Sequence, residues 1–242
     1  MVSRSIILTG ASRGLGAALF DALHNDGARL FAMARTFTPG QSRAAEDDPK
    51  AVVLRGTDLR DVGQYPSADE FCDFVEACGD DDEVVLLHNA ATIEPIGLVG
   101  TLSSVDLAAA VQVNLVAPMA LTNTFLAAMP ARLGHVRIVY ITSAAAHKRY
   151  PGWAAYCATK AGAETFMRTV GKAAIRPCTV DIVDPGAMET SMQRAIRDRG
   201  LGLPGHDKLV ERHQRGQIPD PVSVVAWIMD RHFGPEPAPP IS

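Results

Sequence analysis

Thr9-Gly10-Ala11-Ser12-Arg13-Gly14-Leu15-Gly16 is the stretch that decides the fold, because it joins an apolar run (residues 5–9) to a segment with helical spacing (14–25). Its three glycines permit a tight turn, a close approach of backbone to a phosphate, and close packing of the helix on a sheet. The helix amino terminus then offers unpaired N–H groups and a positive dipole end to a pyrophosphate. We expect a dinucleotide-binding turn; an ordinary structural turn is the alternative.

The rest of the chain repeats this alternation. Apolar runs rich in Ile, Val and Leu occur at residues 29–34, 52–55, 84–88, 136–142 and 179–183, with helical spacing at 67–78, 104–129, 154–173 and 220–231. Runs that are apolar on both faces and separated by helices indicate a covered parallel sheet. Right-handed crossovers then predict an α/β fold, a Rossmann-type doubly wound parallel sheet with helices on both faces in three layers.

Three segments depart from the alternation. Residues 37–50 are polar and are predicted to form a surface loop, and the acids at 80–83 a solvated turn. Residues 187–216 are long, polar and rich in arginine after a strand end, where lids over sites are often inserted. We expect one domain over residues 1–242, with a lid-like insertion at about 187–216.

Composition excludes several classes of protein. The 242 residues are 47% apolar and carry a net charge of −4, which argues against a disordered chain and against nucleic-acid binding through a global positive field. Cys72, Cys78, Cys157 and Cys178 form no C-x-x-C pair, and no metal-ligand set is visible. Polar residues interrupt the apolar stretch 107–129, so no membrane span is expected. These features predict a cytoplasmic protein.

The charged residues near the glycine turn indicate which dinucleotide binds. The run 29–34 ends in Arg35, where an NAD site usually has an acid, and Arg13 lies inside the glycine turn. Two guanidinium groups suit a 2′-phosphate, which favours NADP(H). Arg35 as a solvated loop cation is the alternative. Asp58 is a candidate adenine contact or a helix cap.

A second group of residues points to acid–base chemistry. Ser143 ends an apolar run, and Tyr156 and Lys160 share one face of a later helix because they are four residues apart. A nearby ammonium lowers the pKa of a phenol, so we expect Tyr156 to give a proton to a carbonyl oxygen that Ser143 holds. A buried tyrosine beside a lysine is the structural alternative.

Taken together, these motifs resemble the short-chain dehydrogenase/reductase family over nearly the full length. The resemblance implies a Ser–Tyr–Lys centre assisted by Asn114, which would hold a water that relays protons to Lys160. It also implies contacts of Tyr156 and Lys160 with the nicotinamide cofactor. The other cofactor-binding residues that it implies are Gly10, Ser12, Arg13, Gly14, Leu15, Gly16, Arg35, Asp58, Leu59, Asn89, Ala90, Ala91, Pro185, Gly186, Met188 and Thr190.

Within the family, residues 114–122, 152–162 and 189–193 are similar to the sepiapterin reductase and benzil reductase branch. This implies an NADPH-dependent carbonyl reductase acting on a vicinal diketone, an aromatic ketone or a pterin side chain. Trp153 and Met192 would line an apolar substrate pocket beside Ser143 and Tyr156.

The chain also departs from the family pattern. His88 stands where asparagine is usual, and we expect it to be a structural hydrogen-bonder; Ala91 stands where glycine is usual. The proline-rich tail 234–242 is a poor last strand, which leaves the family's oligomeric contacts in doubt and a homodimer open.

Two other functions remain as alternatives. A 3-oxoacyl thioester reductase would use basic residues such as His147, Lys148 and Arg149 to attract an acidic carrier protein, although a solvated loop is the simpler interpretation of these three. A regulatory protein that binds NADP(H) without turnover would lack the tyrosine or the lysine, and both are present.

Overall fold

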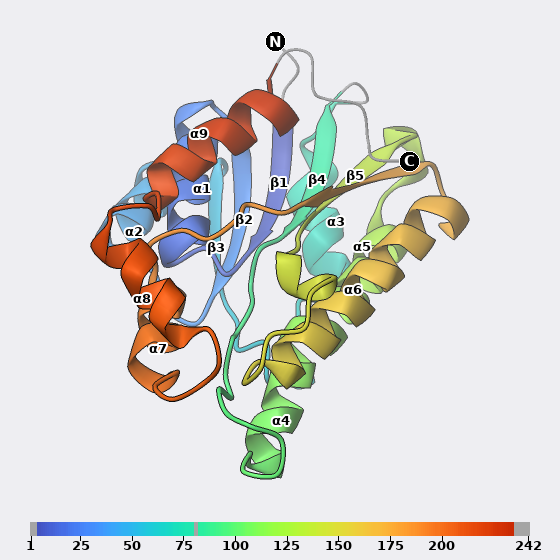
Figure 1. Ribbon diagram of the computed structural model, residues 1–242. Coiled ribbons are helices and arrows are strands. Elements are labelled where there is room, and N and C mark those ends of the chain that lie inside the picture. The colour runs from blue at the N-terminus through green and yellow to red at the C-terminus, as the bar shows by residue number, and fades with distance from the viewer. Residues whose placement is uncertain (1–3, 80–81, 235–242) are drawn as a thin grey trace.

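The computed structural model describes residues 4–79 and 82–234, and in these a six-stranded parallel sheet forms the centre (Figure 1). Its strand order is β3-β2-β1-β4-β5-β6. The predicted doubly wound α/β fold is therefore confirmed. The strands are β1 (Arg4–Thr9), β2 (Arg29–Ala34), β3 (Val52–Gly56), β4 (Glu83–His88), β5 (Val136–Ile141) and β6 (Cys178–Val183).

The order of the strands reverses beside β1. The chain builds outward through β2 and β3, then crosses back to place β4 on the other side of β1. In register, Ile7 pairs with Phe31 of β2 and with Leu86 of β4. Ligands of open α/β sheets bind at such a reversal, outside the carboxyl ends of the strands.

Helices cover both faces of the sheet (Figure 1). On one face, α1 (Gly14–Asn25) and α9 (Pro221–His232) lie side by side and bury Leu19 and Ile228 against the strands. On the other face, α3 (Ala68–Glu76), α5 (Ala117–Ala128) and α6 (Ala154–Ala173) bury Phe71, Phe125 and Met167. These two apolar layers hold the strand ends, and with them the site, in place.

One long helical stretch is not a regular α-helix. α4 (Ser104–Val111) runs into a π-helical segment, Gln112–Val116, and then into α5. By length and composition Ser104–Ala128 would suffice to cross a membrane, with a mean hydropathy of 1.5 and 33% of that window buried. Here it packs against α6 and places Asn114 at the π segment.

The prediction of a surface loop at 37–50 is wrong, because α2 (Pro39–Asp47) forms there. Thr38 accepts a hydrogen bond from the backbone of Gln41, whose side chain accepts one from the backbone of Thr38. This capping box, with Pro39 in the first turn, starts a helix that its polar composition concealed.

The prediction of a solvated turn at residues 80–83 is wrong for Glu83, which lies in a strand. Glu83 begins β4 and forms ion pairs with Arg4 and Arg137, both at 2.9 Å. Asp80 and Asp81 lie outside the described residues.

The segment 187–216, expected to be lid-like, contains α7 (Ser191–Arg199) and α8 (His206–Gln214). Figure 1 places both helices at the lower end of the molecule, where β1 runs into α1. The predicted final helix is present as α9, and residues 235–242 of the proline-rich tail lie outside the described residues.

Candidate active site

The glycine turn has the conformation that its sequence predicts. Gly10 and Gly14 have positive φ values of 70° and 53°, a region that disfavours side chains. A Cβ on Gly16 would lie 2.0 Å from the carbonyl oxygen of Gly10, so only glycine lets α1 approach the turn. No side chain caps the start of α1. Its first N–H groups can therefore receive a pyrophosphate, and this end of the site fits a dinucleotide.

Asn89 joins the glycine turn to the end of β4. Its side-chain amide donates to the carbonyl oxygens of Thr9 and Gly10, both at 3.1 Å. The Thr9 hydroxyl accepts from the backbone N–H groups of Asn89 and Ala90, both at 3.0 Å. A Cβ on Gly10 would lie 2.9 Å from Ala90 Cα. The Asn89 side chain is therefore committed to the turn, and Ala90 and the half-buried Ala91 form the adjoining wall.

The expected adenosine end carries free positive charge. Arg13 and Arg35 are exposed, and neither forms an ion pair or side-chain hydrogen bond with the described residues. Asp58 lies near enough to Arg35 to feel its charge, but Arg60 binds its carboxylate. The hydrogen bond from Arg60 lowers the pKa of Asp58 to about 2. Neighbouring Leu59 is held by Tyr65, whose hydroxyl donates to the Leu59 carbonyl at 2.8 Å.

Ser143, Tyr156 and Lys160 meet at the carboxyl end of β5. Ser143 follows the strand and caps the short 3₁₀ turn η4 (Ala144–Ala146), where its hydroxyl accepts the N–H of Ala145 at 3.2 Å. Tyr156 and Lys160 lie one turn apart on α6 and are 7% and 3% exposed. The Ser143 hydroxyl lies close enough to Tyr156 to lower the pKa of its phenol, against the effect of burial.

The pKa of Tyr156 does not follow the sequence-based expectation. Burial raises it to about 12, while the hydrogen bond with Ser143 opposes the rise. The Lys160 ammonium lies 5.9 Å from the Tyr156 ring centre and donates to the Ile141 carbonyl at 2.7 Å. The pKa of Tyr156 is therefore raised rather than lowered, and the phenol is neutral and able to donate a proton near pH 7.

Lys160 itself is a buried cation. Burial lowers its pKa to about 8, and the carboxylates of Asp184 and Glu164 oppose this. Its ammonium lies 4.9 Å from the centre of the Tyr140 ring. Lys160 is consequently poised between charged and neutral forms just above neutral pH.

Asn114 is buried on the π segment, and its side chain braces a loop. Oδ1 accepts the N–H of Thr92, and Nδ2 donates to the Thr92 carbonyl, both at 2.8 Å. Nδ2 also donates to the hydroxyl of Thr159, one residue before Lys160. Both polar atoms of the amide side chain thus bond to protein groups, and the water that the resemblance implies stays a prediction.

The expected nicotinamide end follows β6. Gly186 donates its N–H to Asp184, and Met188 is buried in the core beside α1. The side chain of Thr190 caps α7 and lies next to Gly14, since a Cβ there would be 3.2 Å from its methyl group. The glycine turn and the start of α7 are therefore adjacent. Pro185 is half-buried between them and the end of β6.

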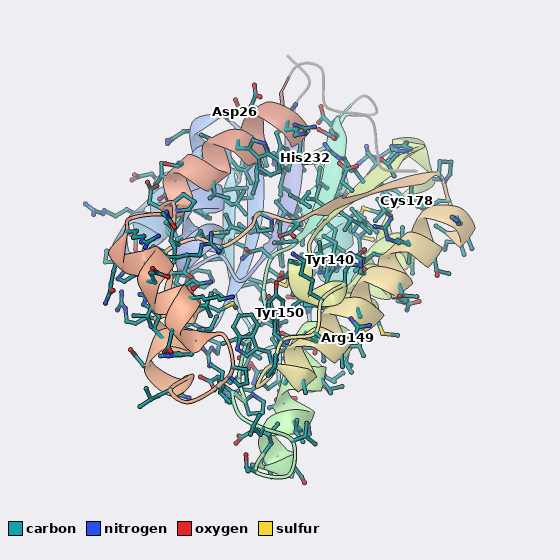
Figure 2. The ribbon with its side chains drawn as sticks, in the orientation of Figure 1. Asp26, Tyr140, Arg149, Tyr150, Cys178 and His232 are labelled. Carbon is teal, nitrogen blue, oxygen red and sulfur yellow. The ribbon has the colours of Figure 1, made fainter. Side chains whose placement is uncertain are left out.

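The side of Tyr156 that faces α7 is apolar. Trp153 and Met192 pack in one cluster with Tyr156, Ile93 and Ile196. The Trp153 ring lies against Tyr150, with 4.8 Å between ring centres, and Figure 2 shows Tyr150 and Arg149 near the middle of the molecule. These contacts agree with the expected apolar substrate side.

Several residues beside the site were not singled out by the sequence analysis. Glu164 is buried one turn after Lys160, and Asp184 raises the pKa values of both Tyr156 and Lys160. The four-residue spacing from Lys160 was the available signal for Glu164. His147, expected on a solvated loop, lies 3.1 Å from the Glu164 carboxylate. Among the described residues, no group of three or more His, Cys, Asp or Glu side chains is arranged to hold a metal.

Comparison with known proteins defines the class. The family model for short chain dehydrogenases matches residues 4–200, so the chain belongs to this family of oxidoreductases, which act on CH–OH/C=O groups with a nicotinamide cofactor. It is similar to a benzil reductase ((S)-benzoin forming) of Bacillus cereus, with 28% identity over 231 residues, covering 93% of this chain and 92% of the relative. A benzil reductase of Bacillus subtilis (strain 168) is 32% identical over 196 residues, covering 79% and 77%.

The architecture agrees with a solved structure as well. An actinorhodin polyketide ketoreductase variant, solved with NADPH, matches with a TM-score of 0.72 and 25% identity, covering 94% of this chain and 90% of that one. The resemblance to the family and to its benzil reductase branch is thus confirmed, whereas the likeness to sepiapterin reductases stays a prediction.

Proposed function

We propose that this protein is an NADPH-dependent carbonyl reductase for vicinal diketones or aromatic ketones. The observation that carries the proposal is a buried Tyr156 phenol beside Ser143, with Lys160 one turn away on α6. This group lies at the carboxyl edge of the sheet, where the strand order reverses and the glycine turn stands.

In this proposal the glycine turn and the start of α1 would hold the dinucleotide, which would supply a hydride for the carbonyl carbon. Tyr156 donates its proton to the carbonyl oxygen, and Ser143 donates a hydrogen bond to the same oxygen as charge develops. Lys160, with its pKa near 8, places a positive charge one turn along α6 from the phenol, and this charge stabilises the negative charge that forms on Tyr156 as its proton leaves. Asn114 fixes the loop at Thr92 and the helix at Thr159.

Two features support an apolar diketone or aromatic ketone as substrate. The similar Bacillus proteins are benzil reductases, and the side chains around Tyr156 form an apolar, aromatic-containing cluster. A pterin side chain is a further candidate for the assay. The carrier-protein alternative has less support, because His147, one of the three basic residues expected to attract the carrier, lies 3.1 Å from the buried Glu164. In the segment 187–216, Arg197 and Arg199 are also paired, with Glu189 and Glu94. We propose that this segment covers the substrate as a lid.

The test is NADPH oxidation with a panel of benzil, other diketones, quinones, a pterin and a 3-oxoacyl thioester. We expect turnover of diketones, and a loss of about 10²–10⁴-fold in kcat for Tyr156→Phe because the proton donor is removed. The folded state of the variant is checked by its thermal transition. Near-normal turnover by Tyr156→Phe would refute the role of this residue, and tight NADPH binding without turnover of any ketone would favour a regulatory protein.

For the cofactor, we propose a preference for NADPH over NADH, with Arg13 and Arg35 gripping the 2′-phosphate. Both side chains are exposed and without partners among the described residues, so no ion pair must break before they bind an anion. Arg35→Ala should raise Kd for NADPH about tenfold and leave Kd for NADH nearly unchanged, as measured by fluorescence titration. Equal affinities for the two cofactors in the wild type would defeat the assignment.

We also propose that the protein works in the cytoplasm as a homodimer. Its four cysteines are free thiols. Val105 and Val111 are exposed on α4 and Met119 on α5. Such an apolar face suits a second copy of the chain. Light scattering after size-exclusion chromatography measures the mass, and a monomer at micromolar concentration would contradict the dimer.

A further inference from the structure

A buried carboxylate lies behind the candidate catalytic residues. Glu164 is 3% exposed on α6, and its Oε2 accepts a hydrogen bond from the Thr142 hydroxyl at 2.7 Å. Its Oε1 lies 2.9 Å from Arg168 Nη2 and 3.1 Å from His147 Nε2. Burying a carboxylate costs free energy, and these three partners offset that cost. An apolar side chain at this position would not incur it.

Two of these partners flank Ser143. Thr142 immediately precedes it, and His147 follows the 3₁₀ turn that Ser143 caps. The backbone of Thr142 also donates to the Val183 carbonyl on β6 at 2.8 Å. One carboxylate therefore fastens both sides of the Ser143 turn to the helix that carries Tyr156 and Lys160.

Glu164 also contributes to the electrostatic surroundings of Lys160. The groups that face this ammonium are the Tyr140 ring and Ile141 carbonyl of β5, Tyr156 of α6, His88 of β4, Asp184 after β6, and Glu164. Burial lowers the pKa of Lys160, and the two carboxylates oppose it. Asp184 is exposed, whereas Glu164 is fixed and shielded from solvent, so salt should screen Glu164 much less.

We propose that Glu164 is a positioning residue of the reduction: it holds the Ser143 turn against α6 and keeps Lys160 charged at the pH of catalysis. The inference rests on the proposed function, because it assumes that Ser143 and Lys160 serve proton donation by Tyr156. It makes two separable statements, one on the charge of Lys160 and one on the placement of Ser143.

The first statement is tested without turnover. The chain has five lysines, so ¹³Cε labelling gives a simple NMR titration in which Lys160→Arg identifies the Lys160 signal. Glu164→Gln keeps the shape and a hydrogen-bond acceptor for Thr142 but removes the charge. We expect the titration midpoint of Lys160 to fall by about one pH unit, in low and high salt alike. The matched control is Glu211→Gln, which breaks an exposed pair with Arg215 on α8 and should not move the midpoint.

The second statement is tested by kinetics of ketone reduction. Glu164→Gln should move the alkaline limb of the kcat–pH profile down by the same amount as the Lys160 midpoint. Thr142→Val removes the hydrogen bond without changing charge, and it should lower kcat about tenfold at every pH with no shift of the limb. KM should change little in both variants, because neither side chain belongs to the apolar substrate cluster.

The outcomes separate the inference from the function on which it rests. An unchanged Lys160 midpoint in folded Glu164→Gln, or a normal kcat in Thr142→Val, overturns the corresponding statement. If the wild type reduces no ketone, the proposed function and the placement statement fail together, and the NMR titration still decides the charge statement. If Glu164→Gln does not fold, Glu164→Asp replaces it: the shorter carboxylate should leave Lys160 charged but lower kcat, and a normal kcat would overturn the placement of Ser143.

Discussion

At the end of β4, His88 is 3% exposed, and its Nε2 lies 2.9 Å from the hydroxyl of Thr122. Burial, with the charge of Lys160 as a second cause, lowers its pKa from 6.5 to about 3. The expectation of a structural hydrogen-bonder agrees with this contact. The ring is therefore neutral in the folded state between about pH 3 and pH 6.5, where the unfolded chain binds a proton.

This difference predicts an acid sensitivity. Between pH 6.5 and about 3 the unfolded state binds the proton and the folded state does not, so the contribution of His88 to stability is complete above pH 6.5 and is lost as the pH falls. The slope is about 1.4 kcal/mol per pH unit for one group. Urea unfolding at pH 7, 5.5 and 4.5 should show a steeper loss for the wild type than for His88→Asn. Parallel losses in the two proteins would contradict the prediction.

Residue identity and spacing predicted much of the site. Three glycines at fixed intervals predicted the turn, and a four-residue interval placed Tyr156 and Lys160 on one face of α6. What spacing could not give is the depth of burial, and burial decides the sign of the Tyr156 pKa shift. Glu164 was missed for the same reason, since a glutamate on a helix is usually solvated and only the packing shows it enclosed.

At the scale of elements, hydrophobic periodicity located the strands and most of the helices. Short runs of Ile, Val and Leu between segments with helical spacing are typical of the buried strands of a parallel sheet. It failed at α2, whose polar surface leaves no apolar period while local capping by Thr38 and Gln41 still forms the helix. It also could not show the π segment at Gln112–Val116, since one extra residue in a turn leaves no mark in composition.

One ion pair fastens α7 to a neighbouring loop. An ion pair of 2.7 Å joins Arg199, at the end of α7, to Glu94 on the loop after β4, so two elements that border the apolar cluster are fastened together. The Arg199 side chain is 65% exposed, so the pair contributes little to global stability. If the segment 187–216 covers the substrate as we propose, Arg199→Ala should nevertheless raise KM for a diketone about two- to fivefold while kcat stays within about twofold, because the closed form of the segment loses one of its contacts.

A control lies on the same helix. Arg194 is exposed and has no ion pair among the described residues, so Arg194→Ala removes the same charge without breaking the contact with Glu94. Its KM should equal that of the wild type. Raised salt should increase KM in the wild type toward the value of Arg199→Ala. Equal KM values for the two variants would mean that the ion pair does not hold the segment.

At the scale of the whole molecule, stability and chemistry are placed at opposite ends of the sheet. Arg137 at the start of β5 is buried, and it pairs with Asp181 of β6 and with Glu83 of β4 and donates to the carbonyl of His232 at the end of α9. Figure 2 shows His232 near the upper end and Tyr150, beside the site, lower down, near the middle of the molecule. Three strands and the last helix thus converge on one guanidinium.

Removing one of the Arg137 ion pairs should therefore lower the free energy of unfolding and leave kcat unchanged. Asp181→Asn leaves the buried Arg137 with one carboxylate partner, Glu83, instead of two, and we expect a loss of about 2 kcal/mol in the free energy of unfolding, measured with urea at pH 7. Because the pKa of Asp181 is lowered by His232 and Arg137, against the effect of burial, the difference from the wild type should shrink as the pH falls and the carboxylate becomes protonated. Glu211→Gln, which breaks an exposed pair, should cost less than about 1 kcal/mol. Turnover of the folded Asp181→Asn protein should equal that of the wild type, because the candidate site lies at the carboxyl ends of the strands. A large fall in kcat at unchanged stability would show that the Arg137 ion pairs and the candidate site are not independent.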